Sequence, residues 1–328
     1  MYKREKGCSI MTRKLISTIV VAVLLCMTII YAATSGSIQM SYFEFIQALF
    51  DSNNAQMAVI KDLRFPRILV ALMAGAALSV AGVLLQAIMR NPLADSGIIG
   101  ISSGAAFTKL LIVSFFPLYF YYTPLAAFIG GALACFLVFS LSWKSGLNPL
   151  KLILVGIAIN ALFAGLTEAL LSFGASNSGV TTSSLQLKTW DDVYLIVLYG
   201  SIGLVLAFFV YKWCNVLVLS DKTAKSIGFN VNGARVIIAA IAVLLSAISV
   251  VVAGVIAFVG ILVPHIARRL VGHDHKILIP FTALLGAFII LLADTLGRTL
   301  ITPHEIPAAT IMAIIGGPFL IFLIRRDK

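Results

Sequence analysis

Charged side chains are scarce in this sequence. Only 11% of its 328 residues are Asp, Glu, Lys or Arg, whereas 60% are hydrophobic and the mean hydropathy is +1.05. Soluble globular domains carry about 25% charged residues. The composition therefore excludes an ordinary soluble domain and indicates a chain that lies largely within a lipid bilayer.

Nucleotide-binding, metal-binding and catalytic motifs are missing as well. The sequence has no G-x-x-x-x-G-K-[ST] loop for nucleotide phosphates and no Gly-Lys pair. Its four cysteines lack metal-ligand spacing. The histidines of VPHIARRLVGHDH fit a solvated helix end better than a metal site, and no carboxylate pair or nucleophile–base spacing is visible. We therefore expect a chain that is not an enzyme and binds no cofactor or metal.

Acidic residues are rare inside the apolar runs, where they would mark a proton or sodium relay. Only Glu168 and Asp294 qualify. Asp294 has a potential ion-pair partner one helical turn away, Arg298. Glu168 has none nearby and is a candidate pathway residue. An ion-coupled secondary transporter stays open as an alternative, although such a protein would be expected to carry more buried acids.

What the sequence has in abundance is long apolar runs, which predict an all-α integral membrane protein with about ten transmembrane helices. The eighth run is shorter than the others. We expect one transmembrane domain over residues 14–324, between terminal tails 1–13 and 325–328. The predicted spans are 14–34, 68–89, 105–122, 124–143, 152–173, 195–217, 236–256, 258–271, 277–297 and 307–324.

The net charge of +11 follows a topological pattern. If the N-terminus is cytoplasmic, 18 of the 24 Lys and Arg residues fall on the cytoplasmic side, as the positive-inside rule requires. Lys109 falls within the third span, near its predicted inner end. We therefore expect both termini in the cytoplasm and no nucleic-acid partner. The five cationic residues on the outer side are Lys61, Arg64, Arg67, Lys188 and Arg298.

One polar stretch, RNPLADSGIIGISSG at residues 90–104, interrupts the apolar pattern. Pro92 is expected to end the preceding helix, and the glycines that follow allow the backbone to bend. Residues 218–235 form a second polar connection on the cytoplasmic side, in which Ser220 is a plausible N-cap and two short helices are expected to meet near Gly228.

Several motifs resemble one family. LRFPRILVALMAGAALSVAGVLLQAIMRNPLADSGIIGISSGA, AKSIGFNV, GVIAFVGILVPHIARRLVGHDHK and LLADTLGR followed by EIPAATIMAIIGGPFLIFLI resemble, in order, segments of the iron-complex and cobalamin importer permeases. These are the membrane subunits of ATP-binding-cassette (ABC) importers, of the FecCD type. The resemblance covers residues 15 to 325 and implies a type II ABC importer permease fold.

The resemblance also implies partners. Two copies of a separate ATPase subunit would use ATP, a substrate-binding protein or lipoprotein would deliver cargo, and a second permease copy or paralogue would complete the pathway in the cell membrane. IKDLRFPRILVALM, KTWDDVY and ADTLGR with EIPA are closest to haem and ferric-siderophore permeases of Gram-positive surface systems. Cobalamin import is the alternative cargo.

Site residues follow from the same resemblance. Arg64, Arg67 and Arg298 would meet carboxylates of the binding protein, since a guanidinium forms bidentate pairs with them. The ATPase would contact the cytoplasmic loop through a helix placed in a groove. The coupling candidates are Ser220, Asp221, Ala224, Lys225, Ile227 and Gly228; the cytoplasmic-gate candidates are Asn91, Pro92 and Leu93, with a second set at Asn148, Pro149 and Leu150.

Overall fold

The computed structural model describes residues 2–35, 60–143, 149–173, 185–301 and 304–326, and the structural statements below concern these ranges. Within them the chain is helical and contains no strand. The elements are α1 (Tyr2–Thr34), the π-helical turn η1 (Ile60–Arg64), α4 (Phe65–Met89), α5 (Ile101–Phe115), the 3-10 helix η2 (Pro117–Tyr122), α6 (Thr123–Trp143), α7 (Pro149–Ser172), α8 (Trp190–Phe209), α9 (Tyr211–Leu217), α10 (Asp221–Ser226), α11 (Val231–Ala253), α12 (Val259–Val271), α13 (His275–Thr299) and α14 (Ala308–Arg326).

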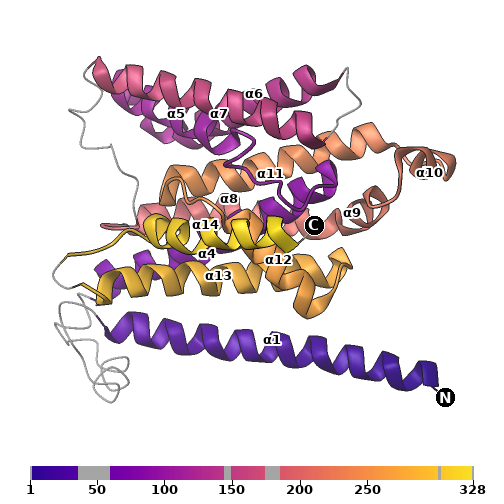
Figure 1. Cartoon of the computed structure of the whole chain (residues 1–328). Helices are drawn as coiled ribbons and strands as arrows, with labels where there is room; N and C mark the ends of the chain where they lie inside the picture. The colour runs from indigo at the N-terminus through magenta and orange to yellow at the C-terminus, as the bar shows by residue number, and fades with distance from the viewer. Residues whose placement is uncertain (1, 36–59, 144–148, 174–184, 302–303, 327–328) are drawn as a thin grey trace.

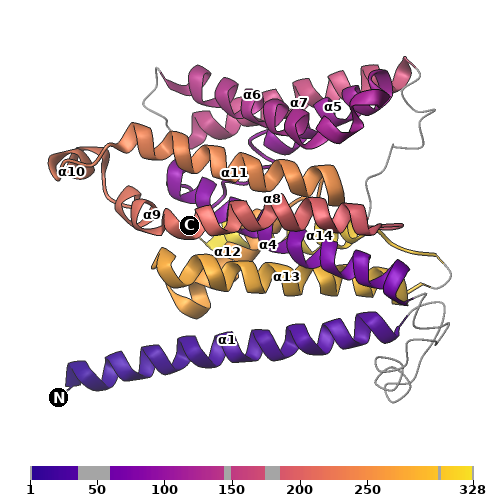
Figure 2. The same ribbon diagram turned by 180° about the vertical axis from the view of Figure 1, so that it is seen from behind.

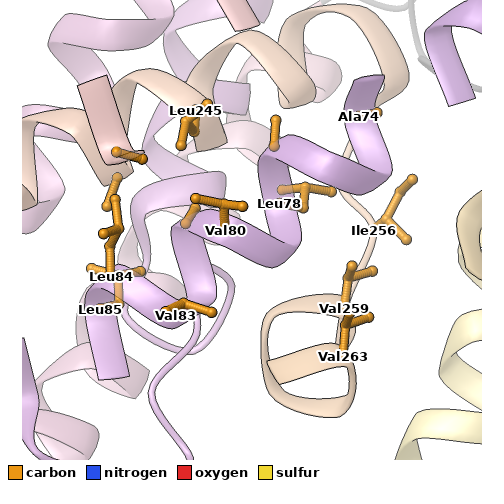
Figure 3. Packing of buried hydrophobic residues seen from close by; sticks show 14 of the residues in the cluster. Ala74, Leu78, Val80, Val83, Leu84, Leu85, Leu245, Ile256, Val259 and Val263 are labelled. Atoms are coloured by element: carbon orange, nitrogen blue, oxygen red, sulfur yellow. The ribbon is translucent and has the colours of Figure 1, made fainter. Parts of the chain in front are cut away.

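Helix α4 is the centre of the bundle. It packs against α13, α11, α8 and α12, and every residue from Ala74 to Met89 is buried. Figure 3 shows Leu78, Val83 and Leu84 among apolar side chains of other elements, including Leu245 of α11 and Val259 of α12. A helix that is apolar on all sides needs an apolar environment, which other helices of the bundle supply for α4.

The other helices lie around α4 in layers (Figures 1 and 2). Helices α5, α6 and α7 pack together as one layer, and α1 lies along the opposite side next to α13. Helices α8 and α14 lie on opposite faces, since α14 is in front in Figure 1 and α8 in Figure 2. The short helices α9 and α10 project together at one end, which is the end where α1 begins and toward which α14 runs.

Two helix crossings near α4 depend on glycine. A Cβ at Gly82 would overlap the carbonyl oxygen and Cα of Gly260 on α12, so these two backbones touch. A Cβ at Gly75 would similarly overlap the carbonyl of Gly286 on α13. Small residues at such crossings allow van der Waals packing, which drives helix association in lipid because the hydrophobic effect between helices is absent there.

The ten predicted segments each overlap a helix, and seven helical segments are long and apolar enough to cross a membrane. These seven confirm a multi-pass all-α membrane protein. The count of ten spans and the cytoplasmic position of both termini stay predictions. Helix α5, with 15 residues, and α12, with 13, are shorter than a full span.

Two predicted spans were wrong in outline. The third, 105–122, begins four residues earlier in α5 and ends at Phe115, because Pro117 cannot continue a helix and its predecessor Phe116 adopts φ −132° and ψ 55°. The sixth, 195–217, begins at Trp190 and breaks at Val210 into α8 and α9. A capping box explains its earlier start, because Thr189 and Asp192 satisfy each other's backbone N–H groups.

Candidate functional site

A cavity of about 500 Å³ lies where the segment 90–100, between α4 and α5, meets α7, α14 and the connection before α12. Its walls are mostly apolar and include Ile153 and Ile157 of α7 and Leu320 of α14. Its polar groups are few: Asp95, Ser102, Ser103 and Asn160. A largely apolar cavity with a small number of polar groups is the usual form of a small-molecule site.

The segment 90–100 is folded by local hydrogen bonds. The side-chain oxygen of Asn91 accepts from the backbone N–H of Leu93 at 2.9 Å, which makes a tight turn around Pro92. Asn91 is buried, Pro92 is exposed, and Leu93 lines the cavity. Gly100 adopts φ +85°, a conformation that glycine tolerates best, immediately before α5 begins. Of the second gate set, Asn148 lies outside the described residues, and Pro149 begins α7.

Asp95 is a buried acid at the cavity wall that sequence reasoning missed. Its carboxylate accepts hydrogen bonds from the backbone N–H groups of Gly97 and Gly260. Burial raises its pKa to about 6, against the lowering effect of these hydrogen bonds. Asp95 therefore fastens the segment 90–100 to the start of α12. The available signal was its place in a polar stretch between two apolar runs.

Gln86 completes this connection from α4. Its amide nitrogen donates to the carbonyl of Gly260 at 2.8 Å, and its amide oxygen accepts from the Arg268 guanidinium. Gln86 is buried, so satisfying both ends of its amide avoids a desolvation cost of about 1–3 kcal/mol per unpaired group. Helices α4 and α12 and the segment 90–100 are thus joined by Gln86 and Asp95 around one glycine, Gly260.

Arg90 links this region to residues 218–235, the loop predicted to be cytoplasmic. It ends α4 in a left-handed conformation, with φ +48° and ψ 38°, and its N–H bonds to the carbonyl of Gln86. Its Nε donates to the carbonyl of Leu217 at the end of α9 at 2.6 Å. Its Nη2 lies 2.6 Å from Oδ1 of Asp221, the first residue of α10. Arg235 of α11 binds the same carboxylate with two contacts of 3.0 Å.

The coupling loop is more compact than expected. Ser220 does cap α10, since its hydroxyl accepts from the backbone N–H of Thr223. Only one short helix forms, however, because the chain after Gly228 (φ +78°) enters α11 directly at Val231. The expectation of two short helices was therefore wrong. Ala224 of α10 is fully buried, whereas Ile227 is 63% exposed and Lys225 is exposed. The two apolar coupling candidates, Ala224 and Ile227, therefore face in different directions.

The three arginines predicted to lie on the outer side meet where α4 begins and α13 ends, but their side chains are buried. Arg64 Nη1 donates to the carbonyl of Ala33 at 2.6 Å, and Arg298 Nη2 donates to that of Ala32 at 2.9 Å. Both acceptors lie in the last turn of α1, where carbonyls lack helical partners and cations are favourable. The arginines therefore fasten the outer end of α1 to the bundle.

Arg67 makes the closest contacts with acids. It donates to both carboxylate oxygens of Asp294, at 2.9 Å and 2.8 Å, and to Glu305 at 2.9 Å. The sequence suggested Arg298 as the partner of Asp294. That ion pair is present, at 3.7 Å between Arg298 Nε and Oδ2 of Asp294, but Arg67, which the sequence did not suggest, is the closer partner. Three cations and two anions leave this cluster with a net charge of +1.

Two further charged residues lie along the cavity-lining faces. Lys109 is beyond the middle of α5 rather than near its inner end, and it donates to the carbonyl of Val251 on α11 at 2.7 Å. It lies seven residues after Ser102, thus two turns along the same face. Glu168 is exposed on α7, three turns beyond Ile157. These placements put one cation and one anion beyond the cavity, toward the C-terminal ends of α5 and α7.

The sequence of this chain is similar to those of known transport proteins. The FecCD transport family matches residues 23–326. Two Staphylococcus aureus proteins, from strains MSSA476 and Newman, are each described as probable heme-iron transport system permease protein IsdF. They are 41% and 40% identical to this chain over 310 residues, which are 93% of this chain and 95% of each relative.

Two solved structures are similar. One, described as an inward-facing conformation of a transporter of the metal-chelate ABC type, has a TM-score of 0.80 and 30% identity, and the match covers 95% of this chain and 99% of that one. PsaBC from Streptococcus pneumoniae has a TM-score of 0.62 at 15% identity over 86% of this chain and 95% of that one, so it supports the fold alone. Helices, motifs and relatives agree along nearly the whole length: the chain belongs to the FecCD transport family.

Proposed function

We propose that the chain is the permease subunit of an ABC importer that carries an iron complex, with haem as the first candidate, into the cytoplasm. The observation that carries this proposal is the cavity beside the segment 90–100. Arg90, at the start of that segment, connects the cavity wall to the exposed helix α10. An importer needs a cargo path next to an element that a partner can push. Relatives described as heme-iron permeases favour haem.

The chemistry of the cavity suits an amphipathic iron complex. Apolar side chains such as Ile153, Ile157 and Leu320 would contact hydrocarbon surfaces, while Ser102 and Asn160 could hydrogen-bond to polar substituents. With a volume of about 500 Å³ on one chain, a second permease copy facing it would enlarge the space to suit a macrocycle. The charged residues further along the same faces, Lys109 and Glu168, are candidate pathway residues.

Alternating access would use two gates and two partner contacts. Asn91, Pro92 and Leu93 form the proposed inner gate, with residues 148–150 as its second part. On the cytoplasmic side, α10 would insert Ile227 and Lys225 into a groove on each of two ATPase subunits, which alone hydrolyse ATP. The permease would perform no covalent chemistry and would bias two packed states through contacts that differ between them.

A substrate-binding protein or lipoprotein would dock at the outer end. The docking candidates are still Arg64, Arg67 and Arg298, because their cluster carries a net positive charge. Since each guanidinium already binds an acceptor inside the chain, an incoming carboxylate would have to replace Asp294, Glu305 or a carbonyl of α1. Docking through these residues would therefore rearrange the outer end of α1 and α13.

Uptake by a deletion strain tests this function. Cells lacking the chain, with and without a plasmid copy, would be offered radiolabelled haem, ferric siderophores or cobalamin. We expect loss of haem-iron uptake and its recovery with the plasmid. Loss of only a siderophore or only cobalamin would change the cargo and retain the permease function. Normal uptake of all three would overturn the proposal, and uptake that persists without any ATPase would indicate an ion-coupled transporter.

A further inference from the structure

Arg90 lies where the end of α4, the cytoplasmic loop and the cavity wall meet. Its backbone is the left-handed end of α4, and the cavity-lining residue Leu93 follows three residues later. The left-handed turn directs the chain away from the helix axis. The guanidinium reaches the last carbonyl of α9 and the first residue of α10. One side chain thus spans from the proposed gate to the helix that would receive the ATPase.

Asp221 is shared between two arginines that belong to different helices. Arg235 binds it from α11 through both guanidinium Nη atoms, and Arg90 binds it from α4 at 2.6 Å. A bidentate contact fixes orientation as well as distance. Helix α10 itself packs mainly on α9 and α11 among its described neighbours, and both of these pack on α4. The pair of Arg90 and Asp221 adds a direct side-chain contact between α10 and the end of α4.

We propose that Arg90 is the residue that passes movement of α10 to the cytoplasmic gate, with Asp221 as the shared joint and Arg235 as its anchor on α11. The inference rests on the proposed function and assigns a positioning role to a residue outside the gate and coupling sets. If α10 shifts relative to α11, Asp221 moves with α10. Arg90, which binds Asp221, then pulls the end of α4 and the adjoining turn at Asn91 in the same direction.

The protonation state of the joint supports this role. Burial would raise the pKa of Asp221, but the hydrogen bond and charge of Arg235, followed by those of Arg90, outweigh it and hold the pKa below its ordinary value. Asp221 is therefore ionised at any pH a cytoplasm reaches. The three contacts are partly solvent-exposed, so each contributes only modestly to stability.

The test uses the complete importer, with permease, ATPase and binding protein, in proteoliposomes. The variants are Arg90→Ala, Arg90→Lys, Asp221→Asn and the double variant Arg90→Ala with Asp221→Asn. ATP hydrolysis and cargo uptake are measured together. Arg269→Ala, which removes an exposed cation at the cytoplasmic end of α12, is the matched control.

We expect Arg90→Ala to lower the cargo moved per ATP about fivefold, within the range by which residues between coupled sites change coupling, while ATP hydrolysis stays within about twofold of wild type. The double variant should lose no more than the worse single variant, because both remove one linkage. Arg269→Ala should transport normally. Should Arg90→Ala fail to assemble, Arg90→Lys, which keeps the charge but loses the Nε donor to Leu217, should show an intermediate loss.

The outcomes separate two failures. If wild-type proteoliposomes move no iron complex, the proposed function fails. If the wild type transports and both Arg90 variants move normal cargo per ATP, only the linkage is overturned. Additive losses in the double variant would also overturn it, since independent effects would then act at Arg90 and Asp221.

Discussion

Arg67 and Asp294 form a buried ion pair in which Nε and Nη2 of the arginine each donate to the carboxylate, at 2.9 Å and 2.8 Å. The side chain of Asp294 is only 2% exposed. The pair joins the start of α4 to the end of α13, the two helices at the centre of the bundle. Its first role is therefore in the stability of the outer end, whether or not a binding protein also contacts it.

Breaking this pair should destabilise the chain. Arg67→Met and Asp294→Leu should each cost about 3–5 kcal/mol, because each leaves one buried charge without its main partner. The double variant should recover part of the loss, since two apolar side chains of similar volume can replace a buried pair. Thermal unfolding of the purified permease in detergent measures this. Lys61→Met, at an exposed cation nearby, should change little. Additive losses would contradict the pairing.

A methyl group at the α4–α12 crossing should be poorly tolerated. Gly82→Ala would place its Cβ on the carbonyl of Gly260, and overpacking of this kind costs about 1–3 kcal/mol. We expect a lower midpoint of thermal unfolding and less folded protein in the membrane. Gly165→Ala on α7 is the matched control, because nothing lies within 4 Å of its added Cβ. Equal midpoints for both variants would contradict the backbone contact.

Stability should depend on pH through Asp95. Burial raises its pKa from 3.8 to about 6, so between these two pH values the folded chain keeps a proton that the unfolded chain has already lost. Its favourable contribution is complete below the unfolded pKa and is lost as the pH rises through about 6. Asp95→Asn should abolish this dependence, so the stability of wild type relative to the variant should fall by about 2–3 kcal/mol across the titration, for a shift of roughly two units. The amide NH₂ of the variant cannot accept one of the two backbone N–H groups, which adds a loss of stability that does not depend on pH.

Unfolding of the two proteins at a series of pH values measures this difference. The stability of wild type relative to Asp95→Asn should be highest near the unfolded pKa of 3.8, where the wild-type carboxyl is protonated, and should fall as the pH rises through about 6. A difference that stays constant across this range would show that Asp95 does not titrate there.

The exposed apolar tip of α10 should be needed for ATPase association. Ile227, an apolar residue at the end of α10, is 63% exposed. Ile227→Asp should abolish co-purification of the ATPase, while the midpoint of thermal unfolding of the permease alone stays unchanged. Ile301→Asp makes the same substitution at an exposed position, 54% accessible, near the opposite end of the bundle. Retained ATPase binding by Ile227→Asp would remove this residue from the coupling surface.

The membrane architecture could be predicted because apolar runs and positive charges are local properties of a sequence. Contacts between distant residues could not. The i, i+4 rule led to Arg298 as the partner of Asp294, whereas Arg67 lies 227 residues away along the chain and binds it better. Gln86 and Arg268 carried no signal for the same reason. The helix break before Pro117 could have been predicted, since the residue before a proline disfavours the helical conformation.

The contact between Gly82 and Gly260 also limits how this sequence can change over time. Most packing defects can be repaired by a second substitution that makes the opposing side chain smaller. Here the opposing group is main chain, and no amino acid is smaller than glycine, so a larger residue in α4 has no remedy in α12. The carboxylate of Asp95 closes the remaining space beside Gly260. Descendants of this sequence must therefore keep both glycines together or shift two whole helices apart.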